Sequence, residues 1–362
     1  MTNTPALTVH IDGSGRARPP SARTLYCDGT HDAAFRPGVD LELSHWVPNL
    51  TPERYKADTS TEICLRFVAD PARERAFDLA VNNHVDIDGL LSLFVVSHPE
   101  AALAHRERLV QVAEMGDFQG WGEPPAQRLY QALVLLSTDA AQRRADAADV
   151  VERAFALVRA ALEGDPLPQS QCGVEALRDC GQLLESGAVE RVPLAPRAVH
   201  YRVPVHLAAP DLTPCLAVPR FDADLTAPVL LLPQARARRD AQALQLVSVP
   251  GRDGWFHDLL YPGYCWAETP GRWRPPGLVA DQAREQVRLE SPALHRAAAS
   301  LNAAEQRIGR WSVAESMSVF RGLEGRGFPV VLSMLHDGAI APSSLSPHEV
   351  AQHLSELWEQ AC

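Results

Sequence analysis

A short polar segment carries the residues best suited to chemistry. It spans residues 82–89, reads Asn-Asn-His-Val-Asp-Ile-Asp-Gly, and stands between two apolar runs. Every second residue of an extended loop points to the same side, so His84, Asp86 and Asp88 are expected to converge. One imidazole and two carboxylates suit a divalent ion such as Mn²⁺, Mg²⁺, Fe²⁺ or Zn²⁺. Gly89 would let the backbone turn sharply or approach a ligand closely.

Two other interpretations of this segment are open from the sequence. An EF-hand loop would begin at His84 and place Val95 at its twelfth position, where a bidentate Glu is required. The segment could instead be an Asx-rich turn in which Asp88 caps the following helix. Three converging ionisable groups are costly without a counterion, which favours the metal site.

Predicted strands and helices alternate on both sides of residues 82–89, and these elements determine where the polar side chains of that segment lie. Residues 23–27, 39–43 and 77–81 have strand character, and residues 59–68, 90–96 and 99–115 have helix character. Thr59 and Glu62 have the spacing of a capping box at the start of one helix. This alternation predicts an α/β domain with a mainly parallel sheet flanked by helices. Ligands of such sheets bind at the carboxyl ends of the strands, where residues 82–89 are expected.

The rest of the chain changes in character near Val192, where Pro becomes frequent. Helices are expected before this point, at 127–136, 145–162 and 174–184; the first two fit core packing or the seam of a homodimer. Beyond it we expect strands at 201–207, 228–232, 244–249 and 328–334, and helices at 281–304 and 347–358. We therefore predict a flexible leader at 1–22, a metal-binding α/β domain at 23–190, and an α+β domain at 195–362.

Composition excludes several classes of protein. The formal net charge of -11 disfavours binding to extended nucleic acid. Lys56 is the only lysine, so there is no P-loop, and neither a Gly-x-Gly-x-x-Gly nor a Gly-x-Ser-x-Gly motif occurs. The seven cysteines are scattered, which is typical of reduced thiols. No signal peptide or membrane-spanning stretch is evident, so we expect a cytoplasmic protein with no membrane partner.

Residues 84–92 also resemble motif I of the DHH phosphoesterase superfamily, in which an x-Asp-x-Asp-Gly-x-x-Ser loop joins a strand to a helix. Three further segments resemble the other motifs of that superfamily: Asp28 at a strand end, Ser44-His45-Trp46 in place of Asp-His-His, and Asp117 as the isolated late Asp. The similarity covers about residues 23–120. Two departures stand out, because the motif order is permuted and Ser-His-Trp lacks an Asp and a His. The same segment is similar to an uncharacterised bacterial family that shares its Asn-Asn-His-x-Asp-x-Asp-Gly core.

The resemblance implies a phosphoesterase-like hydrolase with a circularly permuted DHH-like domain. In such enzymes divalent ions activate a water that attacks phosphorus, with Mn²⁺ expected here and Mg²⁺ or Zn²⁺ as alternatives. His84, His45 and Asp88 would be the catalytic groups. The substrate would be a small phosphorylated molecule or a nucleotide. The implied metal ligands are Asp28, His45, His84, Asp86, Asp88 and Asp117.

Substrate contacts are expected from the second domain. Arg252, Arg272 and Arg274 flank an aromatic cluster and could grip a phosphate or carboxylate, or they could be solvated surface charge. His336 is the nearest candidate for the His-containing loop that the resemblance implies. His257 and Cys265, in the aromatic cluster, could form a nucleophilic pair or belong to a packed hub.

Three functions remain open from the sequence. The first is the metal-dependent phosphoesterase. The second is a catalytically degenerate relative that binds a nucleotide or partner, as expected if Trp46 blocks the substrate position. The third is a zinc-type amide or ester hydrolase. Each candidate outside residues 82–89 also has a structural interpretation, because Asp28-Gly29 could be a turn, His45 a packed residue and Asp117 a helix cap.

Overall fold

The computed structural model describes residues 7–12, 16–73, 77–207, 231–281, 286–319, 322–323 and 326–361. The chain forms two compact units. Unit 1 comprises the chain up to Val174 and the separate segment Ala267–Gly271, and unit 2 holds most of the remainder. The boundary therefore falls within helix α7 (Gln171–Glu185) and not at residues 190–195 as expected.

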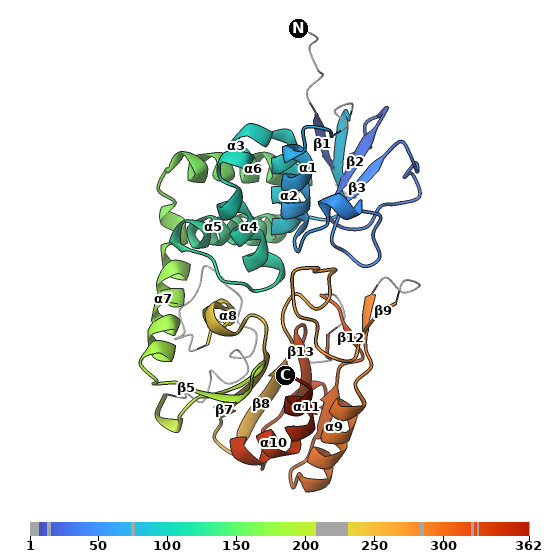
Figure 1. Cartoon of the computed structure of the whole chain (residues 1–362). Coiled ribbons are helices and arrows are strands. Elements are labelled where there is room, and N and C mark those ends of the chain that lie inside the picture. Colours follow the sequence, from blue (N-terminus) through green and yellow to red (C-terminus); the bar gives the residue numbers. More distant parts are fainter. Residues whose placement is uncertain are drawn as a thin grey trace. The chain divides into compact units, whose positions relative to one another are not determined.

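Unit 1 is built on a four-stranded parallel sheet (Figure 1). The strands follow the order β1-β4-β2-β3, and every neighbouring pair is parallel. This confirms the prediction of a parallel sheet in a mixed α/β protein. The strands are β1 (Thr8–Ile11), β2 (Thr24–Cys27), β3 (Leu41–Leu43) and β4 (Leu79–Asn82).

Strand β1 corrects the expectation that residues 1–22 form a flexible leader. Its four residues, Thr-Val-His-Ile, pair with β4 as an edge strand, and the N–H of Thr8 donates to Asp78 O. The signal was missed because so short a run lies among Pro- and Gly-bearing polar sequence. Its stability depends on backbone hydrogen bonds to β4, which no local pattern reveals.

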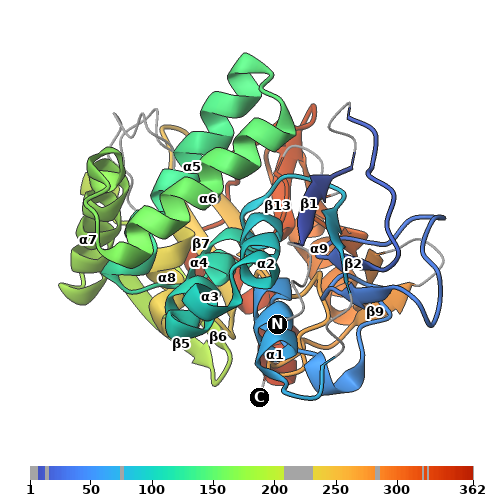
Figure 2. The ribbon, with the colours of Figure 1, turned by 90° about the horizontal axis from the view of Figure 1, so that it is seen from above.

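Helix α2 (Ile87–Ser97) lies at the centre of unit 1. All of its residues except Ser97 are buried, because it packs on β1, β2 and β4 and is itself covered by other helices (Figure 2). A helix that is buried all round must be apolar all round, which explains the continuous apolar run after Gly89. The other helices of the unit are α1 (Ser60–Ala69), α3 (Pro99–Ala104), α4 (Arg106–Asp117), α5 (Pro124–Arg143) and α6 (Ala147–Glu163), with a short 3₁₀ turn, η1 (Glu53–Tyr55).

The helix expected over residues 99–115 is two helices, α3 and α4. His105 separates them with φ −125° and ψ 25°, and its N–H donates to Ala102 O only three residues back. This three-residue hydrogen bond ends α3, and α4 begins at the next residue, Arg106. Asp117 is the last residue of α4.

Unit 2 contains a larger, mixed sheet in the order β11-β13-β8-β7-β6-β5, with β14 paired to β13, and a small antiparallel sheet, β12-β10-β9. Its strands are β5 (Glu190–Ala195), β6 (Ala198–Arg202), β7 (Leu244–Pro250), β8 (Trp255–Leu260), β9 (Leu278–Asp281), β10 (Gln286–Leu289), β11 (Arg310–Val313), β12 (Ser316–Met317), β13 (Val330–His336) and β14 (Ala339–Ile340). Its helices, besides α7, are α8 (Pro233–Asp240), α9 (Pro292–Ala304), α10 (Pro347–His353) and α11 (Ser355–Gln360).

Some expectations for unit 2 were wrong. The helix predicted at 281–304 begins at Pro292, after strand β10, because Ser291 caps it by accepting the N–H of Leu294. The strand predicted at 201–207 ends at Arg202 and is followed by a 3₁₀ turn, η3 (Val205–Leu207). The helix predicted at 347–358 is two, α10 and α11. The strand predicted at 228–232 lies largely outside the described residues.

A buried polar chain crosses the middle of the large sheet. His200 Nε2 lies 2.7 Å from Ser248 Oγ, which lies 2.7 Å from His257 Nδ1, and His257 Nε2 lies 3.1 Å from Leu345 O. Both ring nitrogens of His257 are therefore engaged, and burial raises the pKa of the Cys265 thiol. These contacts favour the packed hub over a nucleophilic pair of His257 and Cys265.

This chain of contacts predicts acid sensitivity. Burial lowers the pKa of His200 to about 3 and that of His257 to about 4, from an ordinary 6.5. Below pH 6.5 the unfolded chain therefore binds protons that the folded chain does not. Stability is full above that pH and falls by up to about 1.4 kcal/mol per pH unit for each histidine as the pH drops towards 4. Urea unfolding at about pH 7.5 and 5.5 measures this slope. His200→Gln should reduce the slope, and an unchanged slope would contradict the assignment.

Within the described part of the chain, no helix combines the length and the apolar character needed to cross a bilayer.

Candidate metal centre

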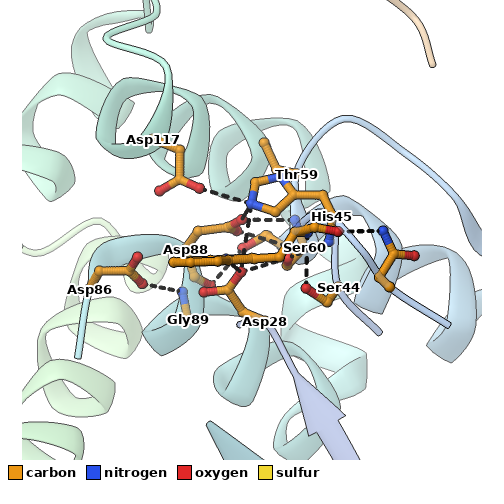
Figure 3. Close-up of polar contacts among 12 residues, drawn as sticks. Asp28, Ser44, His45, Thr59, Ser60, Asp86, Asp88, Gly89 and Asp117 are labelled. Carbon is orange, nitrogen blue, oxygen red and sulfur yellow. Dashed lines mark hydrogen bonds and ion pairs between the residues drawn. The ribbon is translucent and has the colours of Figure 1, made fainter. Parts of the chain in front are cut away.

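The candidate ligands gather where the strands of unit 1 end. Asp28 directly follows β2, His45 comes two residues after β3, and His84 comes two residues after β4. The carboxyl ends of parallel strands meet at one edge of a sheet, so three segments that are distant in sequence reach the same place. Figure 3 shows Asp28, His45, Asp88 and Asp117 facing one another there.

Asp28 lies at the middle of the cluster. Its side chain is fully buried, and its Oδ1 accepts hydrogen bonds from Trp46 Nε1 at 2.9 Å and Ser60 Oγ at 2.8 Å. Its Oδ2 lies 3.2 Å from His84 Nε2. The backbone of Asp28 has φ +63° and that of Gly29 has φ +67°. Asp adopts this left-handed backbone more readily than most residues, so it is the burial and the contacts of Asp28 that distinguish Asp28-Gly29 from an ordinary surface turn.

The donor atoms fall into two overlapping groups that share Asp28. One group is Asp28, His84 and Asp86, and the other is Asp28, His45 and Asp88; within each, the ligand atoms lie within 4.8 Å of one another. Each group offers one imidazole and two carboxylates. That donor set matches what divalent first-row metals bind.

The expected convergence of His84, Asp86 and Asp88 on one point was wrong in its geometry. Asp86 is the N-cap of α2 and accepts the N–H of Gly89 at 2.8 Å, so the chain is already helical at Asp88. Helical rotation turns Asp88 towards α1, where it accepts the backbone N–H groups of Ser60 and Thr61, both at 2.8 Å. Asp86 and Asp88 thus serve different groups, and Asp86 takes the capping role considered for Asp88.

Two asparagines shape the loop that carries His84. Asn82 Oδ1 accepts the backbone N–H of His84 at 2.9 Å, and Asn83 Oδ1 lies 2.6 Å from His84 Nδ1. His84 Nε2 is then directed at Asp28 and at Asp86 Oδ2, 2.9 Å away. The side chain of His84 is 24% exposed, so it faces solvent more than His45, whose side chain is fully buried.

His45 is oriented by the loop that follows it. Its Nδ1 lies 2.7 Å from the carbonyl oxygen of Asp58, which fixes Nδ1 as the protonated donor. Its Nε2 faces the carboxylates, 3.2 Å from Asp117 Oδ2, 3.6 Å from Asp28 Oδ1 and 3.7 Å from Asp88 Oδ2. A histidine that binds a metal is usually oriented in this way, with the ring nitrogen away from the metal bonded to a carbonyl or carboxylate.

The electrostatics of the cluster favour an additional cation. Burial and the charge of Asp28 raise the pKa of Asp88 to about 6, and burial and the charge of Asp88 raise the pKa of Asp117 well above its usual range. Burial alone would lower the pKa of His45, but Asp117, Asp88 and Asp28 raise it to about 10. Burial likewise opposes protonation of His84, yet Asp86 and Asp28 raise its pKa to about 11.

Asp28 behaves differently from its neighbours. Burial would raise its pKa, but the contact with His84 and the charges of His84 and His45 lower it below its ordinary value. The centre is therefore a buried cluster of carboxylates in which protonated imidazoles can balance part of the negative charge. A divalent cation would supply the same compensation and release those protons.

The sequence marks Trp46, Asn82 and Asn83 as parts of motifs, but it does not reveal the contacts that they and Ser60 make in this centre. Ser60 and Trp46 both donate to Asp28, and Asn82 and Asn83 hold the His84 loop. A cavity of about 180 Å³ is bordered by Asp28 together with Asp12, Tyr26, Thr30, His31, Asp32, Val81, Asn82 and Asn83, and it gives the centre an adjoining space.

The four substrate-contact candidates lie in unit 2. Arg272 stacks on Tyr264, with its guanidinium carbon 5.5 Å from the ring centre, and Arg274 donates to Cys265 O at 3.2 Å. Arg252 is exposed in the turn between β7 and β8. His336 ends β13, half-exposed, 3.5 Å from Asp337.

Comparison with known proteins finds similarity to one family, whose function is unknown. Residues 16–164 match a family described as a family of unknown function, DUF6687. No curated protein and no solved structure matches the chain. The matched part contains all six candidate ligands, from Asp28 to Asp117, and it excludes β1 and the segment Ala267–Gly271. The part of the chain that bears the candidate metal centre is thus similar to a family whose function is unknown.

Proposed function

We propose that unit 1 is a divalent-metal-dependent hydrolase domain that acts on a phosphate ester or anhydride. The observation that carries the proposal is the shared carboxylate. Asp28 is buried between two imidazole-and-carboxylate groups, one through His84 and one through His45. A carboxylate shared between two such groups is suited to holding two ions close together, the arrangement that many phosphoryl-transfer sites use.

The residues present fit a metal of intermediate hardness. Asp28, His84 and Asp86 would hold one ion, and Asp28, His45 and Asp88 the other, with Asp117 beside His45. Mixed carboxylate and imidazole donors suit Mn²⁺, and Mg²⁺ or Zn²⁺ are alternatives. The absence of a thiolate among these groups argues against a structural zinc site.

A bound divalent ion would acidify water and neutralise the charge that develops on a phosphoryl group. The protein's own residues would position the reacting groups and handle protons. His84 is the most accessible of the cluster's imidazoles, and its Nε2 lies between Asp28 and Asp86, where it would hold an ion on the solvent-facing side of the site. Asp117 belongs to neither donor group, and its raised pKa suits it to holding a proton deeper in the site, beside His45.

The substrate would be a small phosphorylated molecule or a nucleotide. The cavity of about 180 Å³ beside Asp28 is below the roughly 300 Å³ of sites that enclose a whole ligand, so it would admit the phosphoryl end of such a substrate. Its lining of Thr30, Asn82 and Asn83 offers hydrogen-bonding side chains. The overall charge of -11 disfavours a long polyanion. The resemblance of residues 84–92 to motif I of DHH phosphoesterases points to the same substrate class.

One contact favours a second candidate function. Trp46 Nε1 donates to Asp28 Oδ1, and the Trp46 ring lies edge-on to His84 with 5.2 Å between ring centres. In the sequence resemblance to the DHH motif, Trp46 stands at the position of the second His. The alternative is therefore a catalytically degenerate relative that binds a nucleotide or partner without turnover.

A phosphodiesterase assay separates these functions. The full chain is incubated with bis(p-nitrophenyl) phosphate and Mn²⁺, with EDTA-treated protein as the blank and the double variant Asp86→Asn/Asp88→Asn as the site control. The proposal predicts Mn²⁺-dependent release of nitrophenol that the double variant loses. Nucleotide binding without turnover in the wild type, together with turnover in Trp46→Ala, would support the degenerate relative. Tight binding of a single Zn²⁺ with ester or amide cleavage alone would replace both with the zinc-type hydrolase.

A further inference from the structure

The segment Ala267–Gly271 belongs to unit 1 although more than 90 residues of chain separate it from Val174. We call it the strap, and we call residues 45–58 the His45 loop. The backbone N–H of Glu268 in the strap donates to the carbonyl oxygen of His45 at 2.8 Å. The backbone N–H of Gly271 donates to Asp58 Oδ1 at 2.9 Å. The strap therefore holds the His45 loop at both of its ends.

The carboxylate of Glu268 ties down the middle of the same loop. Its Oε1 lies 2.6 Å from Lys56 Nζ, and its Oε2 accepts a hydrogen bond from Asn49 Nδ2 at 2.8 Å. Lys56 is the only lysine of the chain. The side chains of Lys56 and Glu268 are 23% and 38% exposed, so solvent screens their attraction only in part.

These contacts lead directly to a candidate ligand. Asp58, which the strap holds through its side chain, uses its carbonyl oxygen to orient His45 Nδ1. Loss of the strap would remove one hydrogen bond from the carbonyl of His45 and one from the side chain of Asp58, the residue whose carbonyl orients the His45 imidazole. Gly271 also has little room to be replaced, because a Cβ there would lie 3.0 Å from Asp58 Oδ2.

We propose that the strap positions His45 for metal binding, with Glu268 as its positioning residue. The proposal rests on the metal centre proposed above. It also implies that residues 16–164, the part similar to a known family, do not contain everything that the centre requires. A ligand-orienting contact outside the metal's own ligands commonly changes metal affinity by about 10- to 100-fold.

The test compares five forms of the full chain: wild type, Glu268→Gln, Lys56→Met, Lys56→Arg and Glu53→Gln. Glu53 is the matched control, because its carboxylate lies 3.4 Å from the same Lys56 Nζ but is 89% exposed. Mn²⁺ affinity is measured by titration calorimetry. Acetylation of Lys56 is followed by mass spectrometry, which is straightforward because no other side-chain amine is present.

We expect Glu268→Gln and Lys56→Met each to weaken Mn²⁺ binding about 10-fold. Lys56→Arg should restore affinity and Glu53→Gln should leave it unchanged. The pKa of Lys56 is raised, chiefly by its hydrogen bond to Glu268, so Glu268→Gln should also speed its acetylation relative to wild type. Lower melting temperature with unchanged Mn²⁺ affinity would overturn the positioning role.

Mn²⁺ affinity and the rate of Lys56 acetylation together show whether the strap proposal or the proposed function has failed. Should the wild type bind no Mn²⁺, the metal centre fails and the positioning of a ligand fails with it. The acetylation rates would then still decide whether the strap is held through Glu268. Equal rates in wild type, Glu268→Gln and Glu53→Gln would overturn the strap itself.

Discussion

Asp28→Asn is expected to abolish Mn²⁺ binding in both donor groups and to lower metal-dependent hydrolysis at least about 100-fold. Asp28 is the one residue that both groups share, so no ion could keep its full ligand set after the change. Asn keeps the shape of the side chain and an oxygen for Trp46 Nε1 and Ser60 Oγ. Asn also tolerates the left-handed backbone that position 28 requires, so the variant should fold.

Asp32→Asn is the matched control for this variant. Asp32 borders the same cavity and lies four residues away, but it belongs to neither donor group, and its side chain is 51% exposed beside Arg18. Its replacement should leave Mn²⁺ affinity within about twofold of wild type, as is usual for surface positions. Equal losses in the two variants would mean that Asp28 acts only through the general charge of the region.

Gly89→Ala is expected to lower the free energy of unfolding by about 3 kcal/mol, the upper end for a group forced into a packed interior. A Cβ at position 89 would lie 2.0 Å from Asn82 Nδ2 and 2.9 Å from Asp86 Oδ1. Asn82 cannot simply move aside, because its Oδ1 accepts the N–H of His84. The clash would therefore disturb both the loop and the cap of α2. Chemical unfolding followed by circular dichroism measures the loss.

Gly181→Ala gives the contrasting case for the same chemical change. Gly181 lies inside α7, and a Cβ there would meet no atom within 4 Å. Alanine should stabilise that helix by roughly 0.5 to 1 kcal/mol. If Gly89→Ala proved as harmless as Gly181→Ala, the close packing of Asn82 on the backbone of α2 would be refuted.

Much of unit 1 could be predicted because local signals and tertiary structure agree there. Thr59 accepts the N–H of Glu62 as expected of an N-cap, although Glu62 itself pairs with Arg66 instead of completing the capping box. The apolar runs before and after residues 82–89 became β4 and α2. Two local patterns gave wrong predictions. The four residues of β1 are too few to stand out as a strand, and no residue pattern at His105 shows that the predicted helix divides into α3 and α4.

The sequence predicted which residues meet at the candidate site, but it did not predict how they divide into two donor groups. Asp28, His45 and His84 could be assigned to strand ends, so their meeting at one sheet edge followed from the parallel topology. The division into two groups depended on where α2 begins, and a shift of two residues there sends Asp86 and Asp88 in different directions. No sequence pattern could place Glu268 beside His45, because that contact spans more than 200 residues of chain.

The most direct test of the central claim is a count of the divalent ions that the full chain binds. Purified protein is stripped with EDTA, dialysed against Mn²⁺ and analysed by plasma mass spectrometry beside Asp28→Asn and Asp32→Asn. A shared-carboxylate centre predicts one or two Mn²⁺ per chain in wild type and Asp32→Asn, and none in Asp28→Asn. Wild-type protein that retains no Mn²⁺, or Asp28→Asn that retains as much as wild type, would contradict it.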